Sequence, residues 1–80
     1  MNLIQVYNID KMKGGNNLND YFTLKELRAR KNKTQVEVAK DLDVSPQTYN
    51  SWENNPGIIK LSNLIRLCNY FDIKIGQIKV

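Results

Sequence analysis

The segment 46–54 carries a row of uncharged polar side chains at helical spacing. Gln47, Asn50, Ser51 and Asn54 stand at i, i+3, i+4 and i+7, so on a helix they share one face. An amide can bond N6 and N7 of adenine with two hydrogen bonds, and a hydroxyl can donate to or accept from several base edges. The chemistry that this stripe could perform is therefore the recognition of bases in a DNA groove.

The alternative for this stripe is a polar face that only meets water. Solvated helix faces usually carry Lys and Glu, which the stripe lacks, and this favours base recognition. The segment also has no Lys or Arg, so contacts to phosphates must come from elsewhere. Basic residues outside the segment could supply the salt-dependent attraction to phosphates. The alternative is that they form only an ordinary soluble surface, and this alternative is strongest for Arg30. These residues are Arg28, Arg30, Lys31, Lys33 and Lys60.

Two short helices must position the stripe. The run 34–37, Thr-Gln-Val-Glu, is a capping box that starts the first helix, and Ser45 before Pro46 starts the second. Apart from the caps only residues 43–44 separate them, which predicts a helix-turn-helix in which the second helix crosses the first. Ala39 is small where the helices approach, and the other residues predicted to face inward are Val38, Leu42, Val44, Tyr49 and Trp52.

Further elements are predicted on either side of this pair. A capping box at 23–26 predicts a helix that buries Leu24 and Leu27 beside the stem of Lys31 and ends near Asn32. The turn 54–57 precedes a fourth amphipathic helix that ends at about Asp72. Its apolar face is predicted to consist of Leu61, Leu64, Ile65, Cys68 and Phe71. The tail 73–80 suits either a short helix or a strand, and a strand there could pair with the strand-like run 3–9.

Composition limits the class of protein. Eighty residues allow one domain, and 12 basic against 8 acidic residues give a net charge of +4, which permits an anionic partner. Cys68 is the single cysteine, so no internal disulfide can form, and the lack of histidine argues against a zinc site or a His-based catalyst. No apolar run approaches the roughly 20 residues of a membrane span, and no signal peptide is evident. We therefore expect a cytoplasmic protein that is not an enzyme and needs no cofactor.

The runs 34–42 (TQVEVAKDL) and 44–53 (VSPQTYNSWE) resemble the lambda-repressor/Cro-type, or xenobiotic-response-element, helix-turn-helix family, and the likeness extends from about Leu24 to Ile78. It implies an all-α, compact domain of four to five helices over residues 23–80, with a possible short terminal strand pair. Residues 1–22 would be an N-terminal extension, either disordered or a strand. The resemblance also implies sequence-specific binding of double-stranded DNA by a transcriptional regulator of phage repressor/Cro type. Such proteins commonly act as homodimers on palindromic operators.

The resemblance assigns roles by position. The start and exposed face of the second helix read bases, and these positions hold Pro46, Gln47, Asn50 and Ser51. Phosphate contacts fall on Gln35 and Asn54, to which we add Thr48, Lys33 and Lys60. Arg28 and Glu53 occupy the positions of a structural ion pair, as expected for a half-buried carboxylate that needs a partner.

Three positions depart from the family pattern. Pro46 offers no donor, so van der Waals contact with a thymine methyl would replace a polar base contact there. Asn55 stands where the family often has Gly, and because Asn tolerates left-handed backbone the turn can survive on a different path. The run 74–77 replaces the usual acidic start of helix five.

The N-terminal run has two interpretations. The peptide 13–15, Lys-Gly-Gly, can be encoded by a sequence that resembles a bacterial ribosome-binding site, and Leu18 by a TTG start codon. One hypothesis is therefore that the natural protein starts at residue 18. The other is that residues 1–17 contain a genuine strand.

A second function is compatible with the same fold. An antitoxin-like or protein-interaction module would use exposed apolar residues, and Ile58, Ile59 and the Ile-rich tail are the candidates. Recovery of a protein partner without a salt-sensitive DNA shift would favour this alternative.

Overall fold

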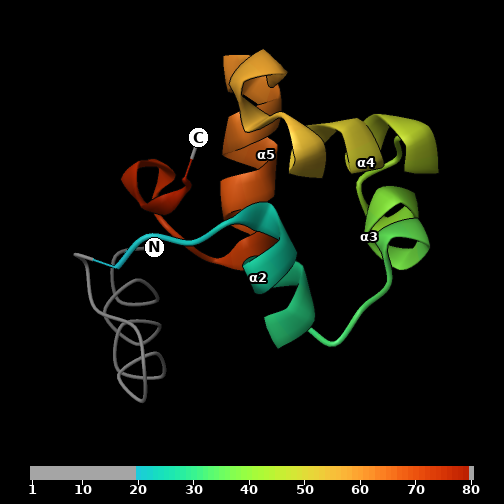
Figure 1. Cartoon of the computed structure of the whole chain (residues 1–80), viewed down its shortest axis with the longest axis horizontal. Helices are drawn as coiled ribbons and strands as arrows, with labels where there is room; N and C mark the ends of the chain where they lie inside the picture. The colour runs from blue at the N-terminus through green and yellow to red at the C-terminus, as the bar shows by residue number, and fades with distance from the viewer. Residues whose placement is uncertain (1–19, 80) are drawn as a thin grey trace.

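The computed structural model of the protein describes residues 20–79, and this part of the chain is built almost entirely from helices. Its α-helices are α2 (Leu24–Arg30), α3 (Gln35–Asp41), α4 (Pro46–Asn54) and α5 (Leu61–Phe71) (Figure 1). Single 3-10 turns, η1 (Pro56–Ile58) and η2 (Ile75–Gln77), follow α4 and α5. The predicted all-α class is therefore confirmed. The strand predicted at 3–9 and the hypothesis about residue 18 lie outside the described residues.

The helices begin where the capping residues predict. At α2 the Thr23 hydroxyl accepts from the Glu26 amide at 3.0 Å, while the Glu26 carboxylate accepts from the Thr23 amide at 2.8 Å. The same reciprocal pair starts α3, between Thr34 and Glu37. At α4 the Ser45 hydroxyl accepts from the Thr48 amide at 3.0 Å, and Pro46 is the first helical residue. Each cap satisfies amides that the first turn leaves without helical partners.

The helices end in sharp turns made by short polar side chains. Asn32, Asp43 and Asp72 have φ values of 57°, 59° and 58°, in the left-handed region that Asn and Asp tolerate better than most residues. Asn32 follows α2, which ends at Arg30, and Asp43 turns the chain between α3 and α4. Asn55 has a φ of −145°. The turn after α4 therefore does not use left-handed backbone at Asn55, and its path differs from the turn that the family pattern suggests.

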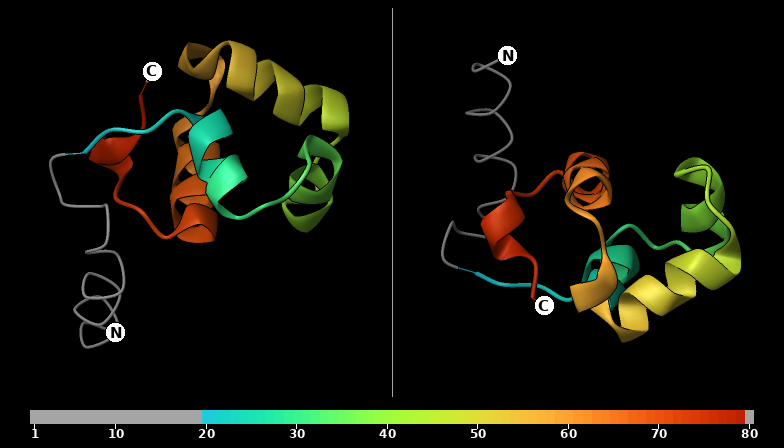
Figure 2. Two further views of the ribbon diagram at one scale, coloured as in Figure 1. Left: turned by 60° about the horizontal axis from the view of Figure 1, so that its bottom comes forward. Right: turned by 90° about the horizontal axis from the view of Figure 1, so that it is seen from above.

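Helix α4 packs against α3 and α2 (Figure 2), and its buried side belongs to the core. Ala39, Val38 and Tyr49 are fully buried, and Leu42 and Trp52 nearly so. The Tyr49 and Trp52 rings pack edge to face with centroids 6.3 Å apart. Val44 is half-buried against this cluster. The predicted contact between the two helices is therefore confirmed, and it turns the opposite side of α4 toward solvent.

The apolar face predicted for α5 is wrong in part. Leu61 and Ile65 are 63% and 48% exposed, whereas Leu67, which the prediction omits, is fully buried beside Cys68 and Phe71. Successive side chains on a helix are turned by about 100° around its axis. Leu61 therefore points roughly 70° away from the centre of the buried face, and Ile65 roughly 110° away. The two residues therefore extend past the edge of the buried stripe. The prediction for Ile59 as an exposed residue is also wrong, because Ile59 is 7% exposed and belongs to the core.

The tail combines both predicted alternatives. Turn η2 is followed by an isolated parallel bridge between Phe22 and Ile78. The Phe22 amide donates to the Gln77 carbonyl at 2.7 Å, and the Lys79 amide donates to the Phe22 carbonyl at 2.8 Å. The tail therefore lies beside the segment that precedes α2 (Figure 1). Within residues 20–79 the described pairing partner of the tail is Phe22, and helix five is reduced to one 3-10 turn.

Candidate nucleic-acid interface

The polar stripe of α4 lies on its exposed side. Gln47, Asn50 and Asn54 are exposed, as is Pro46 at the start of the helix, while Ser51 is half-buried. The Gln47 side chain makes no hydrogen bond to another described residue, so its amide is available to a ligand. The Ser51 hydroxyl donates to the Thr48 carbonyl at 2.7 Å, which leaves the Ser51 oxygen as an acceptor. The structure therefore brings the four predicted base readers onto one accessible face.

The middle of this face is connected to α3 by hydrogen bonds between side chains. The Asn50 Nδ2 donates to the Gln35 Oε1 at 3.0 Å, and the Gln35 Nε2 donates to the Glu53 Oε1 at 2.8 Å. At the other end, the Asn54 Nδ2 donates to the Asn50 Oδ1 at 3.1 Å. We call the three residues Gln35, Asn50 and Asn54 the amide relay. Its side chains come from both helices of the helix-turn-helix.

The relay rests on the ion pair between Arg28 and Glu53. The Arg28 Nε lies 2.6 Å from Glu53 Oε2, and the side chains are 18% and 5% exposed. The hydrogen bond that Arg28 donates to Glu53 raises the pKa of the Arg28 guanidinium. Burial opposes ionisation of Glu53, but the hydrogen bonds from Arg28, Tyr49 and Gln35 outweigh it and lower the pKa of the carboxyl. Both residues therefore carry full charge at neutral pH, and the pair joins α2 to the end of α4.

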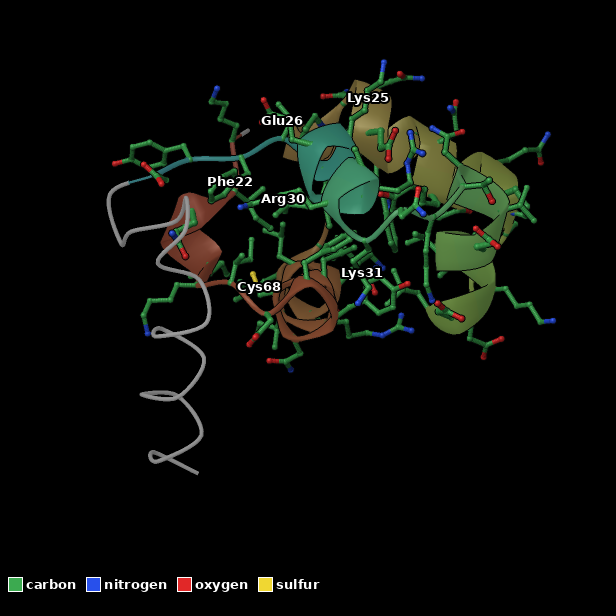
Figure 3. All side chains as sticks on the ribbon, turned by 90° about the horizontal axis from the view of Figure 1, so that it is seen from below. Phe22, Lys25, Glu26, Arg30, Lys31 and Cys68 are labelled. Carbon is green, nitrogen blue, oxygen red and sulfur yellow. The ribbon has the colours of Figure 1, made fainter. Side chains whose placement is uncertain are left out.

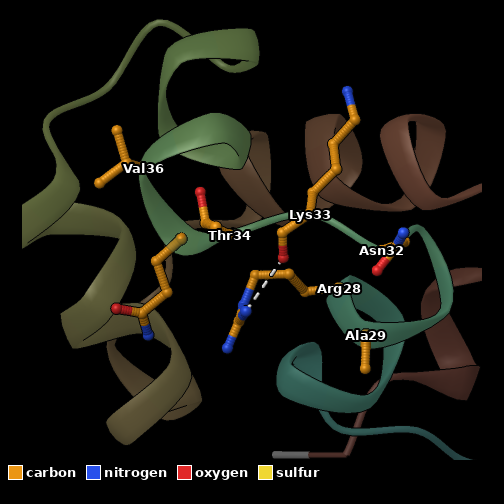
Figure 4. Close-up of a pocket in the computed structure, with 7 residues that line it drawn as sticks. Arg28, Ala29, Asn32, Lys33, Thr34 and Val36 are labelled. Carbon is orange, nitrogen blue, oxygen red and sulfur yellow. Dashed lines mark hydrogen bonds between the residues drawn. The ribbon is translucent and has the colours of Figure 1, made fainter.

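A shallow hollow beside this pair lies between α2 and the start of α3. It has a volume of about 580 Å³ and is lined by Arg28, Ala29, Asn32, Lys33, Thr34, Gln35 and Val36. Within it the Arg28 guanidinium also donates to the Lys33 carbonyl at 3.1 Å (Figure 4). This bond fixes the path of the loop that leads into α3. Two predicted phosphate ligands, Lys33 and Gln35, therefore line the same hollow.

Lys33 also belongs to a second polar cluster at the other end of α3. Its ammonium group lies 2.7 Å from the Asp41 carboxylate, which accepts from the Tyr70 hydroxyl at 2.6 Å. The hydrogen bonds from Lys33 and then from Tyr70 lower the pKa of Asp41. Sequence reasoning missed this cluster, because its members are 8 and 29 residues apart and belong to no periodic pattern. It ties the loop before α3 to the end of α5.

Two further basic residues near α2, Arg30 and Lys31, contact aromatic rings. The Arg30 guanidinium lies 4.7 Å from the centroid of the Phe22 ring, next to the terminal bridge, and Figure 3 shows the two side chains together. The Lys31 ammonium lies 4.7 Å from the centroid of the Tyr70 ring. Cation–π contacts of this kind stabilise tertiary packing. These basic residues therefore have structural contacts, whatever further contacts they make with a ligand.

The other predicted phosphate ligands are spread along α4 and beyond it. Thr48 lies in the first turn of α4, where its hydroxyl accepts from the Ser45 hydroxyl at 2.9 Å. Asn54 is at the last turn, and Lys60 is exposed at the N-cap of α5 without an ion pair to a described residue. Of the predicted phosphate ligands, Gln35 and Asn54 are the two that bond directly to a predicted base reader, Asn50.

No helix in the part of the chain that the structure describes is long and apolar enough to cross a membrane. Comparison with curated proteins and with solved structures finds no match for the chain. A family model described as "Helix-turn-helix" matches residues 24–78. Because this match covers most of the chain, the protein belongs to the helix-turn-helix family of Cro/C1 type, whose members are DNA-binding transcription regulators.

Proposed function

We propose that this protein binds specific sequences in double-stranded DNA and acts as a transcriptional regulator of phage repressor/Cro type. The observation that carries the proposal is the exposed, uncharged amide face of α4, which is backed by the Tyr49–Trp52 core and connected to α3. Helix α4 enters the major groove, where Gln47, Asn50 and Ser51 contact base edges. Pro46 adds van der Waals contact with a thymine methyl. The protein acts without catalysis or a cofactor, in the cytoplasm where its DNA lies.

Phosphate contacts position the helix on the duplex. Lys60 supplies a cation at one end of the reading face, and Lys33 keeps further ammonium hydrogens beyond the one that faces Asp41. Thr48, Gln35 and Asn54 add neutral contacts. Because cations at phosphates displace condensed counterions, binding weakens as salt concentration rises, whatever the base sequence.

Two copies of the chain occupy a palindromic operator. Ile58, Leu61 and Ile65, which we call the α5 patch, are 55%, 63% and 48% exposed. Ile58 follows α4 by four residues, and the other two lie in the first half of α5. A two-fold contact between two such patches covers apolar surface and holds two α4 helices as a pair. Half-sites about 34–36 Å apart, one turn of DNA, fit a helix-turn-helix dimer.

Selection of bound fragments from random or genomic DNA tests the proposal. We expect a palindromic consensus whose affinity falls steeply with salt. Asn50→Ala should lose roughly 1–3 kcal/mol of binding free energy on the consensus duplex and relax the preference at one base pair of each half-site. Asn69→Ala is the matched control, because Asn69 is an exposed asparagine on α5, away from α4. Equal loss for both variants, or equal binding of every duplex by the wild type, would contradict the proposal.

A protein-interaction or antitoxin-like role is the second candidate. The exposure of Ile58 and of Ile75, which is 47% exposed in the tail, favours it. In that case the purified protein would give no salt-sensitive DNA shift, and Ile75→Ser would abolish capture of the protein partner.

A further inference from the structure

The hydrogen bonds of the amide relay all run from donor to acceptor in one direction, and a single group, the Glu53 carboxylate, fixes that direction. A carboxylate can only accept hydrogen bonds, whereas a side-chain amide donates at nitrogen and accepts at oxygen. Glu53 Oε1 therefore requires the Gln35 nitrogen to face it, at 2.8 Å. The Gln35 oxygen is then left for the Asn50 nitrogen, and the Asn50 oxygen is left for the Asn54 nitrogen. One acceptor at the inner end thus determines the orientation of three amides.

This direction matters most at Asn50, the relay residue at the centre of the reading face. Without neighbours, an exposed asparagine amide can rotate by half a turn and exchange the places of its donor and acceptor. In the relay, the nitrogen of Asn50 is turned toward the start of α3 and its oxygen toward Asn54. Each group still has one unused hydrogen-bonding site. Asn50 can therefore approach a base edge with its donor on the α3 side and its acceptor on the Asn54 side.

We propose that Gln35 and Glu53 are positioning residues that fix the direction of the Asn50 amide and thereby set its base preference. The inference rests on the proposed function, because it concerns how the same face chooses a sequence. A base pair that presents its acceptor and donor in the matching order is favoured, and one that presents them in reverse is rejected. Rejection arises because the Asn50 amide would have to turn and break its bonds to Gln35 and Asn54. Glu53 contributes to this choice from a side chain that is 5% exposed.

A role of Gln35 in phosphate binding alone makes a different prediction. A phosphate contact carries no sequence information, so its loss weakens binding to every duplex alike and reduces the salt slope by about one. The relay instead predicts that Gln35 acts through Asn50 and changes the preference among duplexes. The two roles can coexist, because the Gln35 nitrogen has a second hydrogen, but only the relay couples Gln35 to Asn50.

The test is a double-mutant cycle read out as base preference. Gln35→Met keeps the length of the side chain and removes both of its hydrogen bonds. Affinities are measured for the selected duplex and for duplexes changed at the base pair that Asn50→Ala identifies. We expect Gln35→Met to lower the wild-type preference at that pair by about tenfold, the scale of one net hydrogen bond. In the Asn50→Ala background the same substitution should have no further effect on preference.

A matched control separates the relay from general damage to α3. Val36 is the next residue along the chain, is 60% exposed, and makes no relay contact. Val36→Met should leave both the preference and the affinity near wild type. An unchanged base preference in Gln35→Met, or a change in preference that persists in the Asn50→Ala background, would overturn the inference.

A measurement on the free protein separates this inference from the proposed function. In Gln35→Met, the side-chain amide signals of Asn50 and Asn54 in a nitrogen–proton NMR spectrum should move, while that of Asn69 stays. Unmoved Asn50 and Asn54 signals would overturn the inference even if DNA binding is specific. If the proposed function is wrong, the wild-type protein will instead bind every duplex equally. The role of Gln35 and Glu53 in base preference then fails with it.

Discussion

Replacing Arg28 by methionine is expected to destabilise the fold and to weaken the pH dependence that Glu53 contributes. The substitution keeps an apolar stem but leaves a carboxylate that is 5% exposed without its cationic partner. Breaking a buried pair by removing one member costs about 3–5 kcal/mol. The 18% exposure of Arg28 places the expected loss near the lower end, at about 3 kcal/mol. In a domain of this size such a loss lowers the Tm by about 12–24 °C.

The sign of the pH effect follows from the burial of Glu53 and from the hydrogen bonds that it accepts. In the wild type the pKa of Glu53 is lowered, so its contribution is complete above the unfolded-state value of about 4.3 and is lost as the pH falls through the folded-state value. Without Arg28, only the hydrogen bonds from Tyr49 and Gln35 still oppose burial, so the pKa of Glu53 is higher in the variant than in the wild type. As the pH falls through the acid range, the wild type should therefore lose more stability than Arg28→Met, and the gap between the two proteins should narrow.

Urea unfolding followed by fluorescence measures this prediction directly, because Trp52 is the single tryptophan and is 6% exposed in the fold. Lys25→Met is the matched control, since Lys25 is exposed on the same helix. The double variant Arg28→Met/Glu53→Met should recover most of the lost stability, because no buried charge remains. A loss below about 1 kcal/mol, the range of surface pairs, or a double variant as unstable as the single one, would refute the reasoning.

Three further substitutions test other contacts. Tyr49→Phe removes a buried hydroxyl that makes no well-aligned hydrogen bond in the described structure but interacts with the Glu53 carboxylate and helps to lower its pKa, so the free energy of unfolding at pH 7 should fall by no more than about 1 kcal/mol, and a larger loss would contradict this. Asp41→Asn should be less stable than the wild type at pH 7, because hydrogen bonds from Lys33 and Tyr70 lower the pKa of Asp41 and stabilise its charged form in the fold. This contribution is lost as the pH falls, so the difference in stability should close toward about pH 2–3. A difference of constant size would contradict this. Ile65→Ser in the α5 patch should shift sedimentation toward the monomer with little change in monomer stability, since Ile65 is 48% exposed, and an unchanged dimer would place the contact elsewhere.

Local signals in the sequence were sufficient to predict the helix starts and the contact between α3 and α4. The capping residues Thr23, Thr34 and Ser45 act on amides within three residues, so their pattern is visible along the chain. The inward residues of α4 are equally visible, because large aromatic side chains alternate there with amides. These local patterns were also enough to locate the polar stripe on the exposed side of the helix.

The parts that the sequence did not predict depend on distant contacts. The buried side of α5 is chosen by what packs against it, and the spacing of Leu61 and Ile65 alone could not reveal that Leu67 faces the core instead. The Phe22–Ile78 bridge and the Asp41–Tyr70 bond join residues 56 and 29 positions apart. The bond from Asn50 to Gln35 likewise spans two helices, so its place in a relay needs the crossing geometry.

The end of α4 shows why stability and recognition are connected in this protein. Trp52, Glu53 and Asn54 are consecutive, and they point in turn to the core, to the ion pair and to the exposed face. Glu53 accepts from Arg28 on the inside and from Gln35 on the outside, so the group that holds α2 to α4 also orients the relay. A substitution that neutralises this carboxylate must therefore affect both the free energy of unfolding and the direction of the Asn50 amide. The double variant Arg28→Met/Glu53→Met separates the two effects, because it should restore the fold while leaving the relay without its acceptor.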